Sequence, residues 1–154
     1  MKEPTLAPEK LAEMIRVNHA GEYGARRIYQ GQLAVMKTGV DADRIRHMAA
    51  QEEVHLKTFE RLMVEHRVRP SLLLPLWHLG GYAMGAATAL LGRESAYACT
   101  VAVESVIDTH YGEQETMLAA TAHPLKDTVS AFRAEEVEHH DVSIEQGAQQ
   151  APLY

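Results

Sequence analysis

The chain has 154 residues, of which 46% are hydrophobic and 23% charged, and its formal net charge is −6. This length suits a single domain over residues 1–154 and is too short for two ordinary ones. The acidic balance argues against a nucleic-acid partner, because a phosphate backbone is bound by a face rich in Lys and Arg. Cys99 is the only cysteine, which excludes an internal disulfide and a thiolate zinc site and favours a reducing compartment. The N-terminus matches neither a secretory nor an organelle-import signal, so we expect the chain to begin inside its working compartment.

Helical periodicity dominates the sequence, and no stretch alternates polar and apolar residues over a strand-like length. We therefore predict an all-α fold. Proline at first helical positions and glycine near helix ends mark the boundaries. The expected long helices cover residues 8–37, 41–66, 93–120 and 124–147.

Residues 71–92 carry no charge and form the most apolar part of the chain. Their number approaches the roughly 20 residues that a helix needs to cross a bilayer. Pro75 and the glycines at 80, 81 and 85 make the segment a poor continuous helix. We expect an additional hydrophobic connecting helix here, with interrupted regularity.

Each long helix has an apolar stripe at helical spacing that is interrupted by acidic or imidazole side chains. Glu52 and His55 interrupt the stripe of the second helix, three residues apart, and Glu136 and His139 do so on the last one. The other two long helices contribute one inward acid each, Glu22 and Glu104. The chain thus consists of two related halves, each with a Glu followed by a Glu-x-x-His motif.

The charge of the four acids in this repeat indicates a metal site. Four buried carboxylates would repel one another, whereas two divalent cations supply four compensating charges. Mixed carboxylate and imidazole ligands suit iron or manganese, and a Glu from two helices with Glu-x-x-His from two others is the ligand pattern of di-iron bundles. A chain with 16 Glu and 9 His contains about one Glu-x-x-His by chance, so the repetition on inward stripes carries the argument. We predict a ferritin-like four-helix di-iron bundle.

Several neighbouring residues have weaker claims to the site. Tyr111 lies two turns from Glu104 on the same stripe, where it either packs in the core or relays an electron or proton. Asn18 and His19 are candidates to hydrogen-bond the ligands. Four polar residues flank the ligands but leave the stripe, which predicts a solvated or supporting role: Glu53, Glu135, Glu138 and His140.

Four stretches of the sequence resemble the 5-demethoxyubiquinone hydroxylases, which are di-iron monooxygenases of ubiquinone biosynthesis. They are IRVNHAGEYGA from residue 15, QEEVHL from residue 51, ACTVAVE from residue 98 and FRAEEVEHHD from residue 132. The resemblance runs over about residues 15–146 and includes the hydrophobic connector. Members of this family usually continue past an Ala-Pro segment such as Ala151-Pro152 into a further amphipathic helix, whereas this sequence ends at Tyr154.

The resemblance implies a ligand assignment and a reaction. One iron would take Glu22 and His55, the other Glu104 and His139, and Glu52 and Glu136 would bridge both. Oxygen activated at the diferrous centre would hydroxylate the ring of a polyprenyl demethoxyubiquinol, with NADH or the quinol itself as reductant. The sequence contains no GxGxxG dinucleotide-binding motif, so an NADH site would not be a Rossmann domain.

The predicted metal site also constrains residues 71–92. If this connector crossed a bilayer once, the ligands before and after it would lie on opposite sides and could not converge. Its leucines, Trp77 and Tyr82 instead favour a surface that dips into lipid, where it would meet a polyprenyl substrate. We expect a peripheral protein on the cytoplasmic face of a bacterial inner membrane, or on the matrix side in a processed mitochondrial form. The alternative is a connector packed on the bundle, on a second copy or on another ubiquinone-biosynthesis protein.

Two other functions remain open at the sequence level. A ferritin-like ferroxidase or peroxidase would share the ligands but would have no use for the hydrophobic connector. A metal-free helical interaction module would tolerate Glu52→Ala with little effect beyond local packing.

Overall fold

The computed structural model describes residues 2–152 and 154, and within them the chain is helical and contains no strand. The elements are α1 (Pro8–Val35), α2 (Val40–His66), α3 (Leu74–Leu90), α4 (Arg93–Ala120), α5 (Leu125–Glu145) and the short 3-10 helix η1 (Ala148–Gln150). The all-α class is confirmed, and the four long helices lie within two residues of the predicted bounds.

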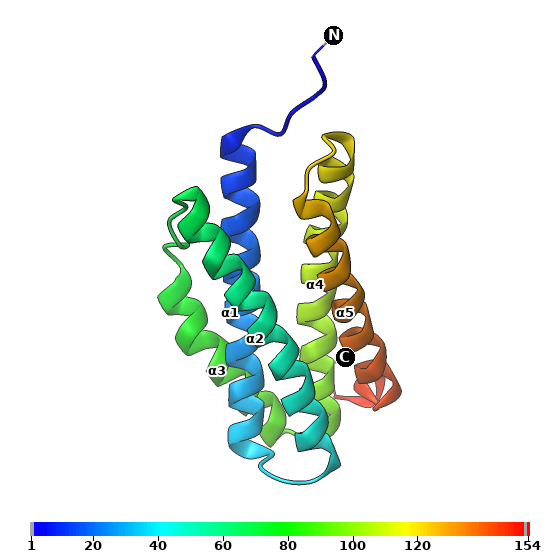
Figure 1. Ribbon diagram of the computed structural model, residues 1–154. Coiled ribbons are helices and arrows are strands. Elements are labelled where there is room, and N and C mark those ends of the chain that lie inside the picture. The colour runs from blue at the N-terminus through cyan, green and yellow to red at the C-terminus, as the bar shows by residue number, and fades with distance from the viewer. Residues whose placement is uncertain (1, 153) are drawn as a thin grey trace.

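The four long helices form two antiparallel pairs (Figure 1). Helix α1 packs against α2, and α4 packs against α5. Helix α3 lies outside the four-helix arrangement, where it packs along α1 and reaches α4 at its C-terminal end. Gly92, with φ at +125°, makes the turn from α3 into α4, a backbone conformation that favours glycine.

Two apolar layers fill the bundle at different heights. One layer joins the N-terminal half of α1 to the C-terminal half of α4 and includes Phe59, Tyr111 and Leu118. The other joins the opposite ends of these helices and includes Tyr29, Ile45 and Tyr97. The acidic and imidazole residues of the inward stripes lie between these layers.

Helix α3 is continuous, so the expectation of interrupted regularity was wrong. Pro75 lies in its first turn, where the missing N–H costs nothing, and Gly81 and Gly85 lie against α1. The carbonyl oxygen of Ile28 would be 2.0 Å from a Cβ on Gly85, and that of Tyr82 would be 2.1 Å from a Cβ on Gly31. Glycine therefore allows the two helices to approach closely. Among the described residues, no helix combines the length and hydropathy needed to cross a membrane.

Gly85→Ala is expected to destabilise the protein by about 3 kcal/mol, because the new methyl group meets backbone atoms that cannot rotate away. Gly80→Ala is the matched control on the same helix, since nothing lies within 4 Å of its added Cβ. That control is expected to be neutral or to gain up to about 1 kcal/mol from helix propensity. Urea unfolding measures both changes, and equal stability of the two variants would show that the close contact does not form.

A salt bridge ties the start of α2 to the start of α4. Arg93 donates from Nε and Nη2 to the two carboxylate oxygens of Asp41, at 2.8 and 3.0 Å, and Tyr97 donates its hydroxyl at 2.7 Å. Arg93 also reaches the carbonyl oxygen of Gln146 at 2.9 Å, beyond the end of α5. The hydrogen bonds from Arg93 are the main cause that lowers the pKa of Asp41 to about 2.

Asp41→Asn is expected to cost about 1–2 kcal/mol at pH 7, less than the full linkage value because the pair is partly exposed. The folded-state pKa lies below the unfolded value of about 4, so the carboxylate stabilises the fold above pH 4 and loses this effect as pH falls toward 2. Chemical denaturation of chelator-treated protein from pH 2 to 7 tests this. Asp43→Asn is the control, because Asp43 pairs with Arg46 at the surface and is 78% exposed. A loss that persists at pH 2 would contradict the ionic origin.

Candidate metal centre

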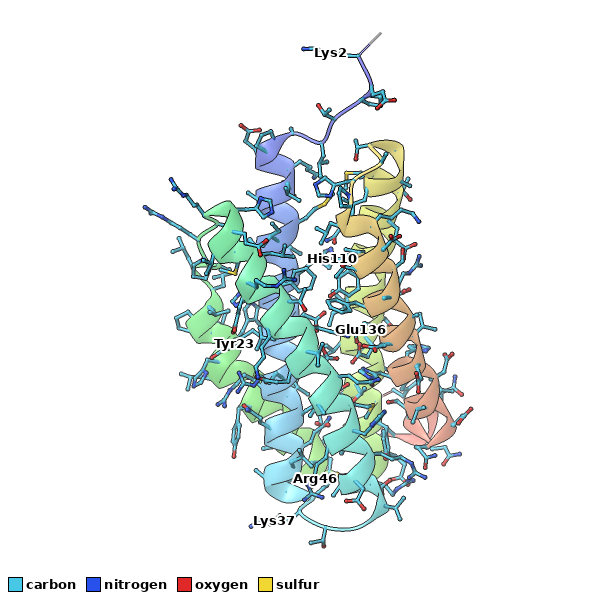
Figure 2. All side chains as sticks on the ribbon, in the orientation of Figure 1. Lys2, Tyr23, Lys37, Arg46, His110 and Glu136 are labelled. Carbon is cyan, nitrogen blue, oxygen red and sulfur yellow. The ribbon has the colours of Figure 1, made fainter. Side chains whose placement is uncertain are left out.

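The structure brings the six predicted residues together in the middle of the bundle. All are buried, at 0–2% exposure, and they come from four different helices. Glu136 lies between the two helix pairs in Figure 2. The full set is Glu22, Glu52, His55, Glu104, Glu136 and His139.

The six residues form two overlapping groups of possible ligands. One contains Glu22 and His55 and the other Glu104 and His139, while Glu52 and Glu136 belong to both. Within each group, one ligand atom per residue lies within 4.8 Å of the others. Two shared carboxylates between two half-sites are the geometry of a dinuclear centre.

Each imidazole directs its Nδ1 atom into the cluster. His55 Nδ1 lies 3.4 Å from Glu22 Oε2 and 2.9 Å from Glu136 Oε1. His139 Nδ1 lies 3.4 Å from Glu104 Oε1 and 3.3 Å from Glu52 Oε1. The two rings thus occupy equivalent positions in the two half-sites.

The buried polar atoms at the centre fit a pair of cations. One oxygen each of Glu22, Glu104 and Glu136, and both oxygens of Glu52, are buried without a hydrogen-bond partner. His139 Nδ1 is likewise buried and unpaired. Leaving such groups unsatisfied is costly, and the atoms face one another across a short distance. A carboxylate and imidazole donor set of this kind suits iron or manganese.

Electrostatics at the cluster show what the cations would balance. Burial is the main cause that raises the pKa of Glu52 well above its usual range, and the carboxylates of Glu22 and Glu136 add to the effect. Burial lowers the pKa of His139, but the carboxylates of Glu104 and Glu136, 3.4 and 3.3 Å from its Nδ1, outweigh this effect and raise the pKa to about 10. The pKa of His55 is raised in the same way, so both imidazoles favour the protonated form beside these carboxylates, and bound metal would displace these protons.

Two tyrosines cross the bundle to the acids of the opposite half. Tyr111 of α4 donates its hydroxyl to Glu22 Oε1 of α1, and Tyr29 of α1 donates to Glu104 Oε1 of α4 at 2.7 Å. Burial, followed by the charge of the carboxylate that each one contacts, raises the pKa of both phenols well above the usual range. Each phenol therefore keeps its proton and fixes one oxygen of a carboxylate.

The outer nitrogens of the two imidazoles also have partners. His55 Nε2 contacts Glu135 Oε2, and His139 Nε2 lies 2.6 Å from Gln51 Oε1. Phe132 stacks on His55 with ring centroids 4.0 Å apart. Both rings are therefore held with Nδ1 toward the cluster.

Sequence reasoning assigned some of these neighbours and missed others. Tyr29 and Gln51 were not predicted as site residues, although Tyr29 follows Glu22 by seven residues as Tyr111 follows Glu104. Asn18, a candidate partner of the ligands, instead exchanges two hydrogen bonds with Gln114 at 2.7 Å.

The remaining flanking residues lie farther from the chemistry. His19 is buried beside Tyr23, with ring centroids 6.2 Å apart, and burial lowers its pKa. Glu53 pairs with Arg26 at 2.9 Å on the surface, while Glu138 is exposed and His140 is half-buried. These three agree with a solvated role.

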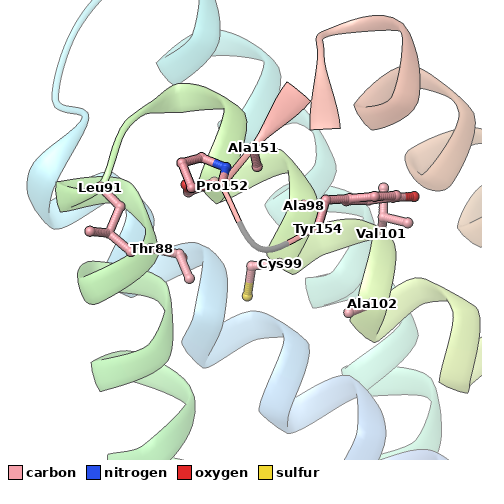
Figure 3. Close-up of a pocket in the computed structure, with 10 residues that line it drawn as sticks. Thr88, Leu91, Ala98, Cys99, Val101, Ala102, Ala151, Pro152 and Tyr154 are labelled. Carbon is pink, nitrogen blue, oxygen red and sulfur yellow. The ribbon is translucent and has the colours of Figure 1, made fainter. Parts of the chain in front are cut away.

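A separate cavity of about 490 Å³ lies between the end of α3, the first half of α4 and the end of the chain (Figure 3). Thr88 and Leu91 line it from the α3 side, Cys99 from α4, and Ala151 and Tyr154 from the end of the chain. None of the six cluster residues lines it. The cavity is mostly apolar and belongs to the face of the molecule that carries α3.

The sequence matches a family model described as "Ubiquinone biosynthesis protein COQ7" over residues 9–154. It is 53% identical over 141 residues to a 3-demethoxyubiquinol 3-hydroxylase of Rhodospirillum rubrum, covering 91% of this chain and 66% of that protein. It is 51% identical over 146 residues to a rat mitochondrial NADPH-dependent 3-demethoxyubiquinone 3-hydroxylase, covering 92% and 67%. A yeast mitochondrial 5-demethoxyubiquinone hydroxylase is 42% identical over 161 residues, covering 94% and 69%.

The chain spans about two thirds of the length of these relatives. The family match nevertheless covers both halves of the bundle and all six clustered residues. Relatives from bacteria, mammals and yeast share the hydroxylase description. The chain therefore belongs to the COQ7 family of ubiquinone biosynthesis proteins.

Proposed function

We propose that this chain is the di-iron core of a hydroxylase that acts on the ring of a polyprenyl demethoxyubiquinol. The observation that carries the proposal is the buried cluster of unpaired carboxylate oxygens, shared between two equivalent half-sites. Relatives described as demethoxyubiquinol or demethoxyubiquinone hydroxylases support the choice of substrate and reaction.

In this proposal Glu22 and His55 would hold one iron, and Glu104 and His139 would hold the other. Glu52 and Glu136, which belong to both groups, would serve both ions. Two bound irons would supply the site at which O₂ is reduced, and NADH, NADPH or the quinol would supply the electrons.

The protein's own contribution is to position these ligands and exclude water. Tyr29 and Tyr111 each hold one carboxylate oxygen, which leaves the other oxygen directed at the metal positions. The apolar layers above and below isolate the cluster in the bundle. A dry site of fixed geometry strengthens the electrostatic interactions on which metal binding and oxygen chemistry depend.

The exposed apolar side chains of α3 and of the turn before it are evidence that the substrate lies in a membrane. Residues 71–92 carry no charge, and the leucines at positions 72, 76 and 79 are 97, 61 and 71% exposed. Trp77 and Tyr82 are 41 and 37% exposed, as suits residues at a lipid interface. We propose that this face lies on the membrane as a monotopic surface. A ferroxidase acting on soluble iron would have no use for it, which favours the hydroxylase.

The test is metal analysis of anaerobically purified protein, followed by exposure to ¹⁸O₂ with reductant and a demethoxyubiquinol of short isoprenoid tail. We expect about two irons per chain and one ¹⁸O atom in the quinone product, read by mass spectrometry. Protein that holds two irons and mineralises iron without altering the quinol would contradict the hydroxylase and support the ferroxidase.

Tyr111→Phe tests whether the phenol relays electrons or only orients Glu22. Loss of one hydrogen bond to a ligand is expected to weaken metal binding by about 10-fold, and a relay would in addition slow turnover of the fully loaded enzyme. Tyr29→Phe is the matched control, because Tyr29 makes the equivalent contact with Glu104. Because the structure places both phenols equivalently, we expect equal effects on affinity and on turnover at saturating iron. A turnover defect confined to Tyr111→Phe would identify a relay.

A further inference from the structure

The two halves of the metal cluster match position by position. Helices α2 and α5 carry the same arrangement: a polar residue, then the Glu shared by both half-sites, and the His three residues after that Glu. These residues are Gln51, Glu52 and His55 on α2, and Glu135, Glu136 and His139 on α5. The two crossing tyrosines preserve the same symmetry, with Tyr111 on Glu22 and Tyr29 on Glu104. The contacts of the two half-sites can therefore be compared directly.

The symmetry breaks at the outer nitrogens of the imidazoles. The residue before each shared Glu reaches across the bundle to the His of the other helix. Glu135 of α5 contacts Nε2 of His55, whereas Gln51 of α2 contacts Nε2 of His139 at 2.6 Å. One imidazole thus donates its outer N–H to a carboxylate and the other to a neutral amide oxygen.

This difference affects the metal through the ring. A hydrogen bond from N–H to a carboxylate is stronger than one to an amide oxygen, and it shifts electron density toward the opposite nitrogen. In both rings that opposite nitrogen is Nδ1, which faces the cluster. His55 is therefore the stronger donor of the two.

We infer that Glu135 and Gln51 are positioning residues that make the two metal positions unequal, so that the position at Glu22 and His55 binds its metal more tightly than the position at Glu104 and His139. This inference rests on the proposed metal centre. It adds that the chain has a defined order of metal loading, set by one charge difference outside the ligand set.

The experiment titrates chelator-treated protein with Co²⁺ under anaerobic conditions and follows visible absorption, which reports each coordinated ion without any turnover. Four proteins are compared: wild type, Glu135→Gln, Gln51→Glu and the double swap. We expect the wild type to bind two ions with unequal dissociation constants. Each single variant gives both imidazoles the same kind of partner at Nε2, and should reduce the ratio of the two dissociation constants by about 10-fold. This is the smallest effect usually seen when such a hydrogen-bond partner is lost.

The double swap exchanges the two partners and is expected to restore the wild-type ratio. A structural role alone would not produce this rescue, since two destabilising changes would add. Equal ratios in all four proteins would overturn the inference, as would a Glu135→Gln variant that weakens both ions alike and is not rescued. Failure of wild type to bind two ions would instead overturn the proposed metal centre, so the two failures are distinguishable.

Discussion

Replacing Glu52 by Gln is expected to abolish stable binding of the metal pair and to lower hydroxylation by more than about 100-fold. Removing a residue that only hydrogen-bonds a ligand costs up to about 100-fold, and losing a ligand should cost more. Glu52 is fully buried, belongs to both half-sites, and has no hydrogen-bond partner on either carboxylate oxygen. An amide of the same shape keeps the packing but carries no charge to share between two cations. Metal content by mass spectrometry and the ¹⁸O assay measure the two losses.

The same substitution should change stability in opposite directions with and without metal. In chelator, Glu52→Gln removes one of four clustered carboxylates, and we expect the free energy of unfolding to rise by about 1–3 kcal/mol. With metal present, the wild type gains stability from binding and the variant does not. Glu53→Gln is the control, since the carboxylate of Glu53, the next residue along the helix, pairs with Arg26 on the surface. If Glu52→Gln were the less stable protein in chelator, the carboxylate would be serving the fold rather than a metal.

The helices and the six clustered residues were predictable because both follow from one periodicity. Apolar stripes at helical spacing locate the helices, and any acid or imidazole on a stripe must face the core. Glu22, Glu52 and Glu136 were therefore expected in the interior of the bundle, regardless of how the helices pack in detail. Whether these residues hold iron stays a prediction, which the loss of metal in Glu52→Gln would test.

Contacts between helices were less predictable. Tyr29 reaches Glu104 because α1 and α4 run antiparallel, and this register is set by the fold rather than by a local pattern. Gln51 lies off the inward stripe, yet its length brings it to His139 on a neighbouring helix. The regularity of α3 was misjudged for a similar reason. Its glycines were expected to break the helix, but two of them, Gly81 and Gly85, pack closely against Ile28 inside a continuous helix.

The exposed face of α3 leads to the second large expected effect. Substituting Leu72, Leu76 and Leu79 together by Asp should weaken binding to phospholipid vesicles by about 100- to 1000-fold. These side chains are 61–97% exposed, with Leu76 and Leu79 one helical turn apart on α3 and Leu72 in the turn before it. Burying a leucine contributes about 1.5–3 kcal/mol when the burial is complete. Partial burial of three leucines at an interface, together with three new charges, accounts for the range. Co-sedimentation with vesicles measures it.

The matched control adds the same three charges elsewhere. Val40, Val54 and Val106 are 57–65% exposed on α2 and α4, and their replacement by Asp should leave vesicle binding unchanged. A quinol with a short, soluble tail separates binding from chemistry, because the α3 variant should turn it over at the wild-type rate while losing activity on a long-tailed quinol in vesicles. A different result would reassign the face. If the wild type sediments as a dimer without lipid, and the α3 variant sediments as a monomer with its vesicle binding intact, then the leucines of α3 pack against a second copy of the chain and not against a membrane.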